Sequence, residues 1–247
     1  MTTETTLPEI STDSLRKTFV EFLPSEMSES SALVRLGAPA IAPNITSFTR
    51  VELGAPAAVA EGHLQPATNY VLKEDEVKKT TLTHIIMASK QSLTTAEGQE
   101  QLQDLFRQAA GHFARGTDTV FLHGTNPVDG AALPEFADTA IIPNAIQNVY
   151  TVGESFDRVL HEASLEIENP NGLGLSKAGY VELATLYTDS GVRKYPNATK
   201  KAAFEFLDMT TVTDRVFGEP AWNGSTSDVL AVEGDYSQVR VGIGNIT

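Results

Sequence analysis

The sequence predicts a mixed α+β fold. A clear helical period occurs over residues 94–124, and shorter helical patterns follow at 154–167 and 176–187. Other segments alternate apolar and polar residues with the period of two that is typical of strands. Because the chain has no internal repeat and no regular alternation of strands and helices, we do not expect a doubly wound parallel sheet.

Residues 1–45 are predicted to form an arm without an independent core. Thr12 is placed to cap a short helix that runs to Leu23, where Pro24 follows. Residues 37–43 (GAPAIAP) contain two prolines and should therefore be extended. Two interpretations stay open: a loosely held terminus, or a segment that becomes ordered only against neighbouring copies of the chain.

Residues 46–93 should contain a long two-stranded hairpin. Residues 47–53 look like one strand, and residues 70–87 have a β-like pattern that supplies the other. The stretch 73–79 (KEDEVKK) is too charged to be buried on both faces. Such a hairpin is only marginally stable in water, so it needs another surface to lie on.

The clearest helical pattern, over residues 94–124, predicts a helix longer than the globular average. Thr94 and Glu97 have the spacing of a capping box, and Gly124 is placed to end the helix. Two further glycines lie inside the pattern. Its apolar positions are Leu102, Leu105, Phe106, Ala109, Ala110, Phe113, Val120 and Phe121.

The second half of the chain is predicted to contain loops, two helices and three short strands. A loop should occupy residues 125–150. A helix from about 154 to 167 follows, opened by a Thr-x-x-Glu pattern and ended by the sequence NPNG. Ser176 is placed to cap the next helix, which runs to about Tyr187. Short strands are expected at 204–209, 228–232 and 238–243.

The composition limits the functions that this chain can have. Acidic residues outnumber basic ones, 32 to 18, and no run of Lys or Arg is longer than a pair. Strong binding to duplex DNA or to an anionic membrane is therefore disfavoured. The absence of cysteine excludes disulfides, thiolate metal sites and cysteine nucleophiles. No apolar run approaches the roughly 18 residues of a membrane helix, and residues 1–11 lack the pattern of a secretory signal.

Four short stretches begin like catalytic or cofactor motifs, and each lacks a residue that the chemistry needs. Residues 161–165 (HEASL) start like a zinc-protease motif, but Leu165 replaces the second ligand. Residues 172–177 (GLGLSK) lack the third glycine of a dinucleotide fingerprint, so a loop followed by a helix cap is the expected structure. Residues 174–181 (GLSKAGYV) have the glycine spacing of a phosphate-binding loop without its lysine. Residues 153–157 (GESFD) lack the last glycine of a nucleophile elbow.

The five histidines, at positions 63, 84, 112, 123 and 161, are scattered, and no arrangement of partners singles out a general base. We therefore predict no catalytic, cofactor-binding or metal-binding residue, and we do not expect an enzyme.

Three strings, in this order, resemble the major capsid proteins of tailed double-stranded DNA bacteriophages. The first is residues 57–66 (AAVAEGHLQP), with Val59 where the family often has tryptophan. The second and most specific is residues 118–130 (DTVFLHGTNPVDG). The third joins residues 217–220 (FGEP) to residues 230–239 (LAVEGDYSQV). The resemblance covers about residues 31–243.

This resemblance implies the capsid fold of that family, which encapsulins share. Its parts would be an N-terminal arm at 1–45 and a peripheral domain at 46–130, with an extended β loop at about 54–80 and a spine helix at about 95–123. An axial domain would follow at 131–225, and return strands at 226–247. Some family members cross-link a loop lysine to an asparagine of a neighbour. Three lysines lie in the corresponding region, but none is assigned that role: Lys73, Lys78 and Lys79.

The function that the resemblance implies is that of a structural head protein. Subunits would self-assemble into hexamers and pentamers of an icosahedral shell, in the host cytoplasm, and remain in the virion. The shell would enclose DNA without sequence-specific binding. The partners would be copies of the chain itself and scaffolding, portal and decoration proteins, with no membrane and no cofactor.

Two other functions are kept as alternatives. One is the shell protein of an encapsulin nanocompartment, which a cargo protein encoded nearby would favour. The other is a small acidic hydrolase, which would need convergent polar residues in a pocket. A monomeric adaptor is disfavoured because the arm and the hairpin lack a core of their own.

The last residues read as an interrupted strand. Val239, Val241 and Ile243 alternate, so one face should be buried. In the resembling family, the string that contains Gly-Asp-Tyr-Ser is followed by further strands of the peripheral sheet. We therefore expect a longer native protein, of which these residues are one part.

Overall fold

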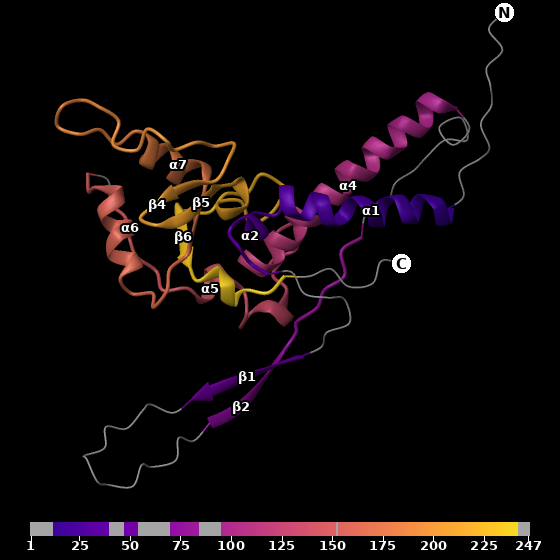
Figure 1. Ribbon diagram of the computed structural model, residues 1–247, viewed down its shortest axis with the longest axis horizontal. Coiled ribbons are helices and arrows are strands. Elements are labelled where there is room, and N and C mark those ends of the chain that lie inside the picture. The colour runs from indigo at the N-terminus through magenta and orange to yellow at the C-terminus, as the bar shows by residue number, and fades with distance from the viewer. Residues whose placement is uncertain (1–11, 40–46, 54–69, 84–94, 152, 242–247) are drawn as a thin grey trace, which may run out of the picture. The chain divides into compact units, whose positions relative to one another are not determined.

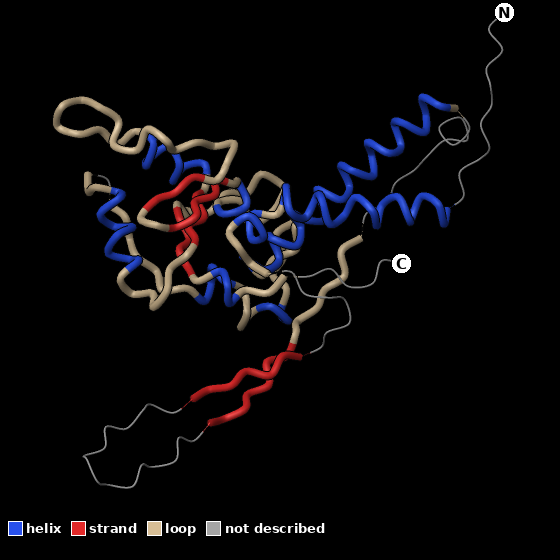
Figure 2. The backbone as a smooth tube through the Cα atoms, in the orientation of Figure 1, coloured by secondary structure: helices blue, strands red, loops and turns tan. Residues whose placement is uncertain are grey.

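The computed structural model describes residues 12–39, 47–53, 70–83, 95–151 and 153–241 (Figures 1 and 2). The chain divides into two compact units, which are described separately. Unit 1 comprises the described residues up to 39 and from 82 to 241, and unit 2 comprises those from 47 to 81. The mixed α+β class predicted from the sequence is confirmed, with a long helix and a four-stranded mixed sheet in unit 1.

Unit 2 contains the predicted hairpin. Strands β1 (Ser47–Leu53) and β2 (Tyr70–Glu76) are antiparallel and pair from Ser47↔Glu76 to Leu53↔Tyr70. The prediction of a β pattern up to residue 87 is wrong for residues 77–83, which form no strand. The ladder ends because Glu76 is already paired with the first residue of β1. Residues 54–69 and 84–87 lie outside the described part of the chain.

Helix α4 (Ala96–His123) is the longest of the described helices and belongs to unit 1. Its N-cap is Thr95, whose side chain accepts a hydrogen bond from the backbone N–H of Gly98, so the predicted cap at Thr94 is wrong by one residue. The helix ends where predicted, because Gly124 adopts the left-handed conformation with φ +66° and its N–H donates to the Val120 carbonyl.

Helix α1 (Thr12–Ser30) packs along α4 and continues through Pro24, so the predicted end at Leu23 is wrong. An internal proline removes one helical hydrogen bond, and tertiary packing offsets that loss. The Phe19 ring makes edge contacts with Phe106 and Phe113 at centroid distances of 6.3 and 5.6 Å.

The segment after α1, which belongs to the predicted arm, packs into the core of unit 1. Helix α2 (Ala32–Arg35) follows its N-cap Ser31 directly. Leu33 and Leu36 are fully buried. They pack in a cluster with residues from the far end of the chain: Val212, Val216, Phe217, Val232, Tyr236 and Val241.

The sheet of unit 1 has the strand order β4-β5-β3-β6. Strand β3 (Gly172–Leu175) is parallel to β5 (Met209–Thr213) and antiparallel to β6 (Ala231–Gly234). Strand β4 (Phe204–Phe206) pairs with β5 across a tight turn in which Leu207 and Asp208 have positive φ, as two-residue hairpin turns require.

All three predicted strands need correction, and so does one predicted loop. Residues 204–209 are not one strand but the first half of the β4–β5 hairpin. Residues 172–175 are not a loop but the central strand β3. The strand expected at 228–232 is β6 at 231–234. Near the C-terminal end, the expected strand at 238–243 begins with a 3-10 turn, η3 (Tyr236–Gln238), although Val241 is fully buried as the alternation predicted.

The glycines of β3 are explained by two aromatic rings that lie against the strand. A Cβ atom at Gly174 would lie 2.2 Å from the Phe217 ring, and one at Gly172 would lie 2.5 Å from the Tyr236 ring. These rings belong to the core cluster that includes α2, and Leu173 and Leu175 belong to a second cluster with α6 and α7. The sheet therefore separates two apolar cores.

The remaining helices are short. The predicted loop at 125–150 contains η1 (Pro134–Phe136) and α5 (Ile141–Asn144). Helix α6 (Phe156–Ser164) is shorter than predicted. Helix α7 (Lys177–Ala184) also ends early, but its predicted cap is confirmed, since the Ser176 side chain accepts from Gly179 N–H. A further 3-10 turn, η2 (Arg215–Phe217), follows β5.

Candidate functional site

The carboxylate of Asp118, on α4, is completely buried and holds the start of α2. It accepts 2.6 Å hydrogen bonds from the Ser31 hydroxyl and from the backbone N–H of Ala32. Burial raises the pKa of Asp118 to about 7, outweighing the two hydrogen bonds, which favour the charged form. We call Asp118 with Ser31 and Ala32 the Asp118 centre. It fixes the N-terminal segment to the long helix.

An ion pair reinforces this attachment. The Arg35 guanidinium donates to the Asp214 carboxylate at 2.6 Å, and that carboxylate also accepts from Val216 N–H. On α4, His123 donates from Nε2 to the Val216 carbonyl at 2.6 Å. Burial lowers the pKa of His123, which favours the neutral ring. Both ends of the segment 214–216 are therefore held by groups from α2 and α4.

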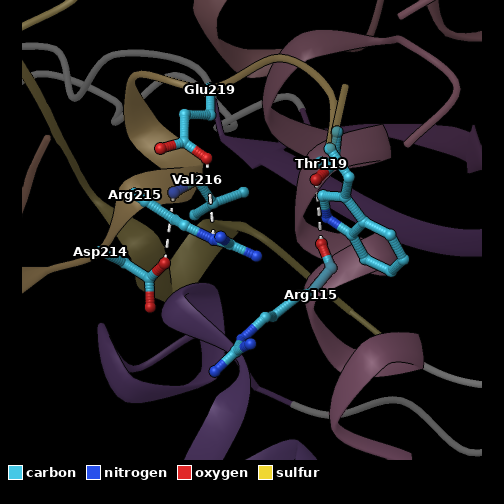
Figure 3. A pocket seen from close by; sticks show the side chains of 7 residues that line it. Arg115, Thr119, Asp214, Arg215, Val216 and Glu219 are labelled. Atoms are coloured by element: carbon cyan, nitrogen blue, oxygen red, sulfur yellow. Dashed lines mark hydrogen bonds and ion pairs between the residues drawn. The ribbon is translucent and has the colours of Figure 1, made fainter. Parts of the chain in front are cut away.

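Beside these contacts lies a surface depression, shown in Figure 3. Arg115 and Thr119 on α4 face the segment after β5 (Figure 3). Two ion pairs already occupy charged side chains of this depression. Asp214 pairs with Arg35, and Arg215 pairs with Glu219 at 3.7 Å. Its lining is Arg115, Thr119, Asp214, Arg215, Val216, Glu219 and Trp222. These side chains include no hydroxyl or amine next to a free base, so they do not form a nucleophile arrangement.

A third polar contact joins α6 to the loop that follows α7. Asp157, nine-tenths buried, accepts hydrogen bonds from Ser155, from the Lys194 ammonium and from the Tyr195 hydroxyl, the last at 2.7 Å. Burial alone would raise the pKa of Asp157, but these three donors outweigh it and lower the pKa to about 2. No local pattern singles out Asp157, because its partners Lys194 and Tyr195 are 37 and 38 residues away in the sequence.

Strand β6 contributes a buried carboxylate with no partner among the described residues. Both side-chain oxygens of Glu233 are buried without a hydrogen bond. Burial raises the pKa of Glu233 to about 7. An isolated buried charge is costly, so the protonated form is favoured up to neutral pH.

The motifs tested in the sequence lie apart. His161 and Leu165 are exposed on and just after α6, and the glycines at 172–175 belong to β3. His63 and His84 lie outside the described residues. Among the described residues, no three side chains of His, Cys, Asp or Glu are arranged to hold a metal. Of the loop lysines, Lys73, Lys78 and Lys79 are all exposed in unit 2.

The helices that the structure describes include none that is long and apolar enough to cross a membrane.

No protein-family model matches the chain, and no curated protein matches it. Solved structures from phages do match. One from Gordonia phage Cozz has a TM-score of 0.66 and 19% identity, over 86% of this chain and 70% of that chain. One from Mycobacterium phage Ogopogo has a TM-score of 0.61 and 21% identity, over 85% of this chain and 74% of that chain.

A third solved structure, from Microbacterium phage Oxtober96, has a TM-score of 0.51 and 16% identity, over 87% of this chain and 73% of that chain. At these identities the likeness is one of fold. The chain therefore has a fold found in phage proteins, over about 86% of its length.

Proposed function

We propose that this chain is the major capsid protein of a tailed double-stranded DNA bacteriophage. Its subunits assemble into hexamers and pentamers of an icosahedral shell that encloses DNA without reading its sequence. The observation that carries the proposal is the fold shared with the structure from Gordonia phage Cozz over 86% of the chain. The role is structural rather than enzymatic, and the protein resides in the virion.

The two described strings of the resemblance support this proposal because they contact each other in the fold. Thr125 donates from its hydroxyl to the Pro220 carbonyl at 2.6 Å, and Trp222 N–H donates to the Pro127 carbonyl at 2.7 Å. Residues 118–130 and 217–220 therefore form one structural centre at the end of α4. Thr125 and Pro220 are 95 residues apart in the sequence. The folded chain brings the two strings into contact, so the fold requires both.

The hairpin of unit 2 also fits an assembling subunit. Leu72 is 60% exposed, and the side chains of Lys73, Glu74 and Glu76 are exposed as well. A two-stranded ribbon is marginal by itself. On this proposal it is the extended loop of the peripheral domain, and a neighbouring subunit supplies the surface that it needs. The segments 46–130 and 131–225 are the proposed peripheral and axial domains.

The charge of −14 suits the wall of a DNA container. An acidic inner surface repels packed phosphates and does not trap DNA on the shell. The additional proposed partners are scaffolding, portal and decoration proteins.

Electron microscopy and size-exclusion chromatography of the purified protein test the proposal. We expect capsomers or closed shells, and in particles from infected cells we expect this chain around phage DNA. Shells that enclose a protein cargo and no DNA would favour the encapsulin alternative. A strictly monomeric protein at high concentration would overturn the capsid function.

A further inference from the structure

The loop between α7 and β4 is unusually basic for this acidic chain. Residues 185–203 contain four Lys or Arg and a single acid, Asp189, which gives a net charge of +3. Lys194 is bound to Asp157, and Lys200 lies 5.0 Å from the centre of the Tyr180 ring. Two cations are left exposed without an acidic partner among the described residues: Arg193 and Lys201.

Helix α6 and the residues around it have the opposite charge. Residues 154–168 contain five acids and one arginine, which gives a net charge of −4. Arg158 pairs with Glu162 at 3.3 Å. Glu166 and Glu168, just after the helix, are exposed and have no cationic partner in the described part of the chain.

Each of these two surfaces also exposes apolar side chains. On the basic loop, Val192 is 62% and Tyr187 56% exposed, and beside the acidic residues Leu165 is 74% exposed. Apolar groups within a rim of charge are typical of protein interfaces. We call residues 187–201 the basic loop and residues 162–168 the acidic segment.

The two surfaces do not satisfy each other within one subunit. Figure 1 shows α6 and the loop after α7 at the same end of unit 1, away from the free ends of α1 and α4. The loop is anchored through Lys194 to Asp157, in the first turn of α6. Glu166 and Glu168 lie beyond the end of α6 at Ser164, and neither pairs with a cation among the described residues. Their charges are therefore exposed and available to another molecule.

We propose that the basic loop of one subunit docks on the acidic segment of a second copy of this chain. The contact joins two different surfaces, so it is head-to-tail, and repeated contacts of this kind close into a ring when the rotation allows it. This inference rests on the proposed function, because the capsomers of a shell are such rings. Charge complementarity sets the orientation of the contact, and the exposed apolar side chains supply its buried area.

Charge reversal in full-length protein tests the contact. One variant carries Glu166→Lys and Glu168→Lys, and the other carries Arg193→Glu and Lys201→Glu. Like charges then oppose each other in each variant alone, so we expect the assembled fraction to fall about tenfold or more. The matched controls, Glu135→Lys and Lys177→Glu, change exposed charges outside both surfaces and should assemble like the unchanged protein.

Mixing the two variants gives the sharpest readout. The loop of each variant is complementary in charge to the segment of the other, so the mixture should recover assembly in alternating rings. Native mass spectrometry should then show even-numbered oligomers with equal shares of the two variants, whereas rings with an odd number of subunits should be lost. All four changes in one chain should restore assembly of a single species.

The outcomes separate this inference from the proposed function. If the unchanged protein forms shells and both variants assemble equally well, the contact is wrong and the capsid function stands. If the unchanged protein stays monomeric, both fail. If the loop variant assembles normally but retains less DNA in its shells, the basic loop binds nucleic acid, and the contact between subunits is overturned.

Discussion

The Asp118 carboxylate and the Ser31 hydroxyl are joined by a 2.6 Å hydrogen bond across 87 residues of sequence. This bond lies entirely in the interior, where ionisation of a carboxyl is unfavourable. The pKa of Asp118 is about 7 in the folded protein and near its ordinary value of 3.8 when unfolded. The difference makes ionisation on the order of 4 kcal/mol more costly in the folded state.

The first prediction is that the Asp118 centre makes folding stability fall as pH rises. Between about pH 4 and pH 7 the folded state retains a proton that the unfolded state has lost, so stability contributed by the neutral carboxyl is lost through that range. Asp118→Asn cannot ionise, and its amide can still bond Ser31. Chemical denaturation from pH 4 to 8 should show a decline in the unchanged protein and a flatter profile in the variant. Parallel profiles would contradict the prediction.

The second prediction concerns Asp157, for which the sign is opposite. Its pKa is about 2 when folded and 3.8 when unfolded, so its contribution is fully present above pH 4 and is lost as pH falls towards 2. Asp157→Asn leaves Lys194 without its anion and should cost about 1–3 kcal/mol at pH 7. The variant should lose less stability on acidification. Asp138→Asn, at an exposed loop position, is the control and should leave the profile unchanged.

The third prediction tests why β3 contains glycine. Gly174→Ala would place a methyl group 2.2 Å from the Phe217 ring, and strain of this kind typically costs about 1–3 kcal/mol or more. Gly234→Ala on the neighbouring strand is the matched control, since its nearest contact is an ordinary 3.7 Å. Thermal unfolding should separate the two variants clearly. Equal midpoints would mean that the ring moves away at little cost.

The fourth prediction concerns the exposed lysines of the hairpin unit. Limited trypsin digestion should cut at Lys73, Lys78 or Lys79 in dissociated subunits and far less in assembled shells, because a neighbour then covers the ribbon. A variant with glutamine at all three positions should lose these fragments, which verifies their origin. Equal cutting in both states would show that the ribbon stays uncovered after assembly.

Sequence reasoning predicted the elements whose signals are local. The period of α4 and the glycine that ends it lie in neighbouring residues, and so does the cap formed by Ser176. The same reasoning failed at Pro24, because the helix there is maintained by the Phe19 contacts with α4, which no local rule contains. It placed the N-cap of α4 one residue early, since Thr94 and Thr95 have equal capping chemistry.

The polar centres were missed for a related reason. Asp118 is the first residue of the string 118–130, but its partner Ser31 is 87 residues away. No local pattern therefore predicts their contact. The sequence predicts a loop at β3 because glycines carry no β signal. Glycine is needed there because the Phe217 and Tyr236 rings lie where a Cβ atom would be, and these rings come from distant parts of the sequence. Signals of this kind become readable when distant segments are known to be neighbours.

The placement of the α2 segment sets the order in which a newly made chain can fold. Pro39 accepts a hydrogen bond from Val241 N–H, across roughly 200 residues that a ribosome adds at about 5–20 per second. For roughly 10–40 s after Leu33 and Leu36 emerge, the residues that cover them do not yet exist, so the nascent segment is a natural client for chaperones. We therefore expect the rate of translation to set the time of assembly: a chain becomes competent to join others only after Leu33 and Leu36 have met partners that are made roughly 200 residues later.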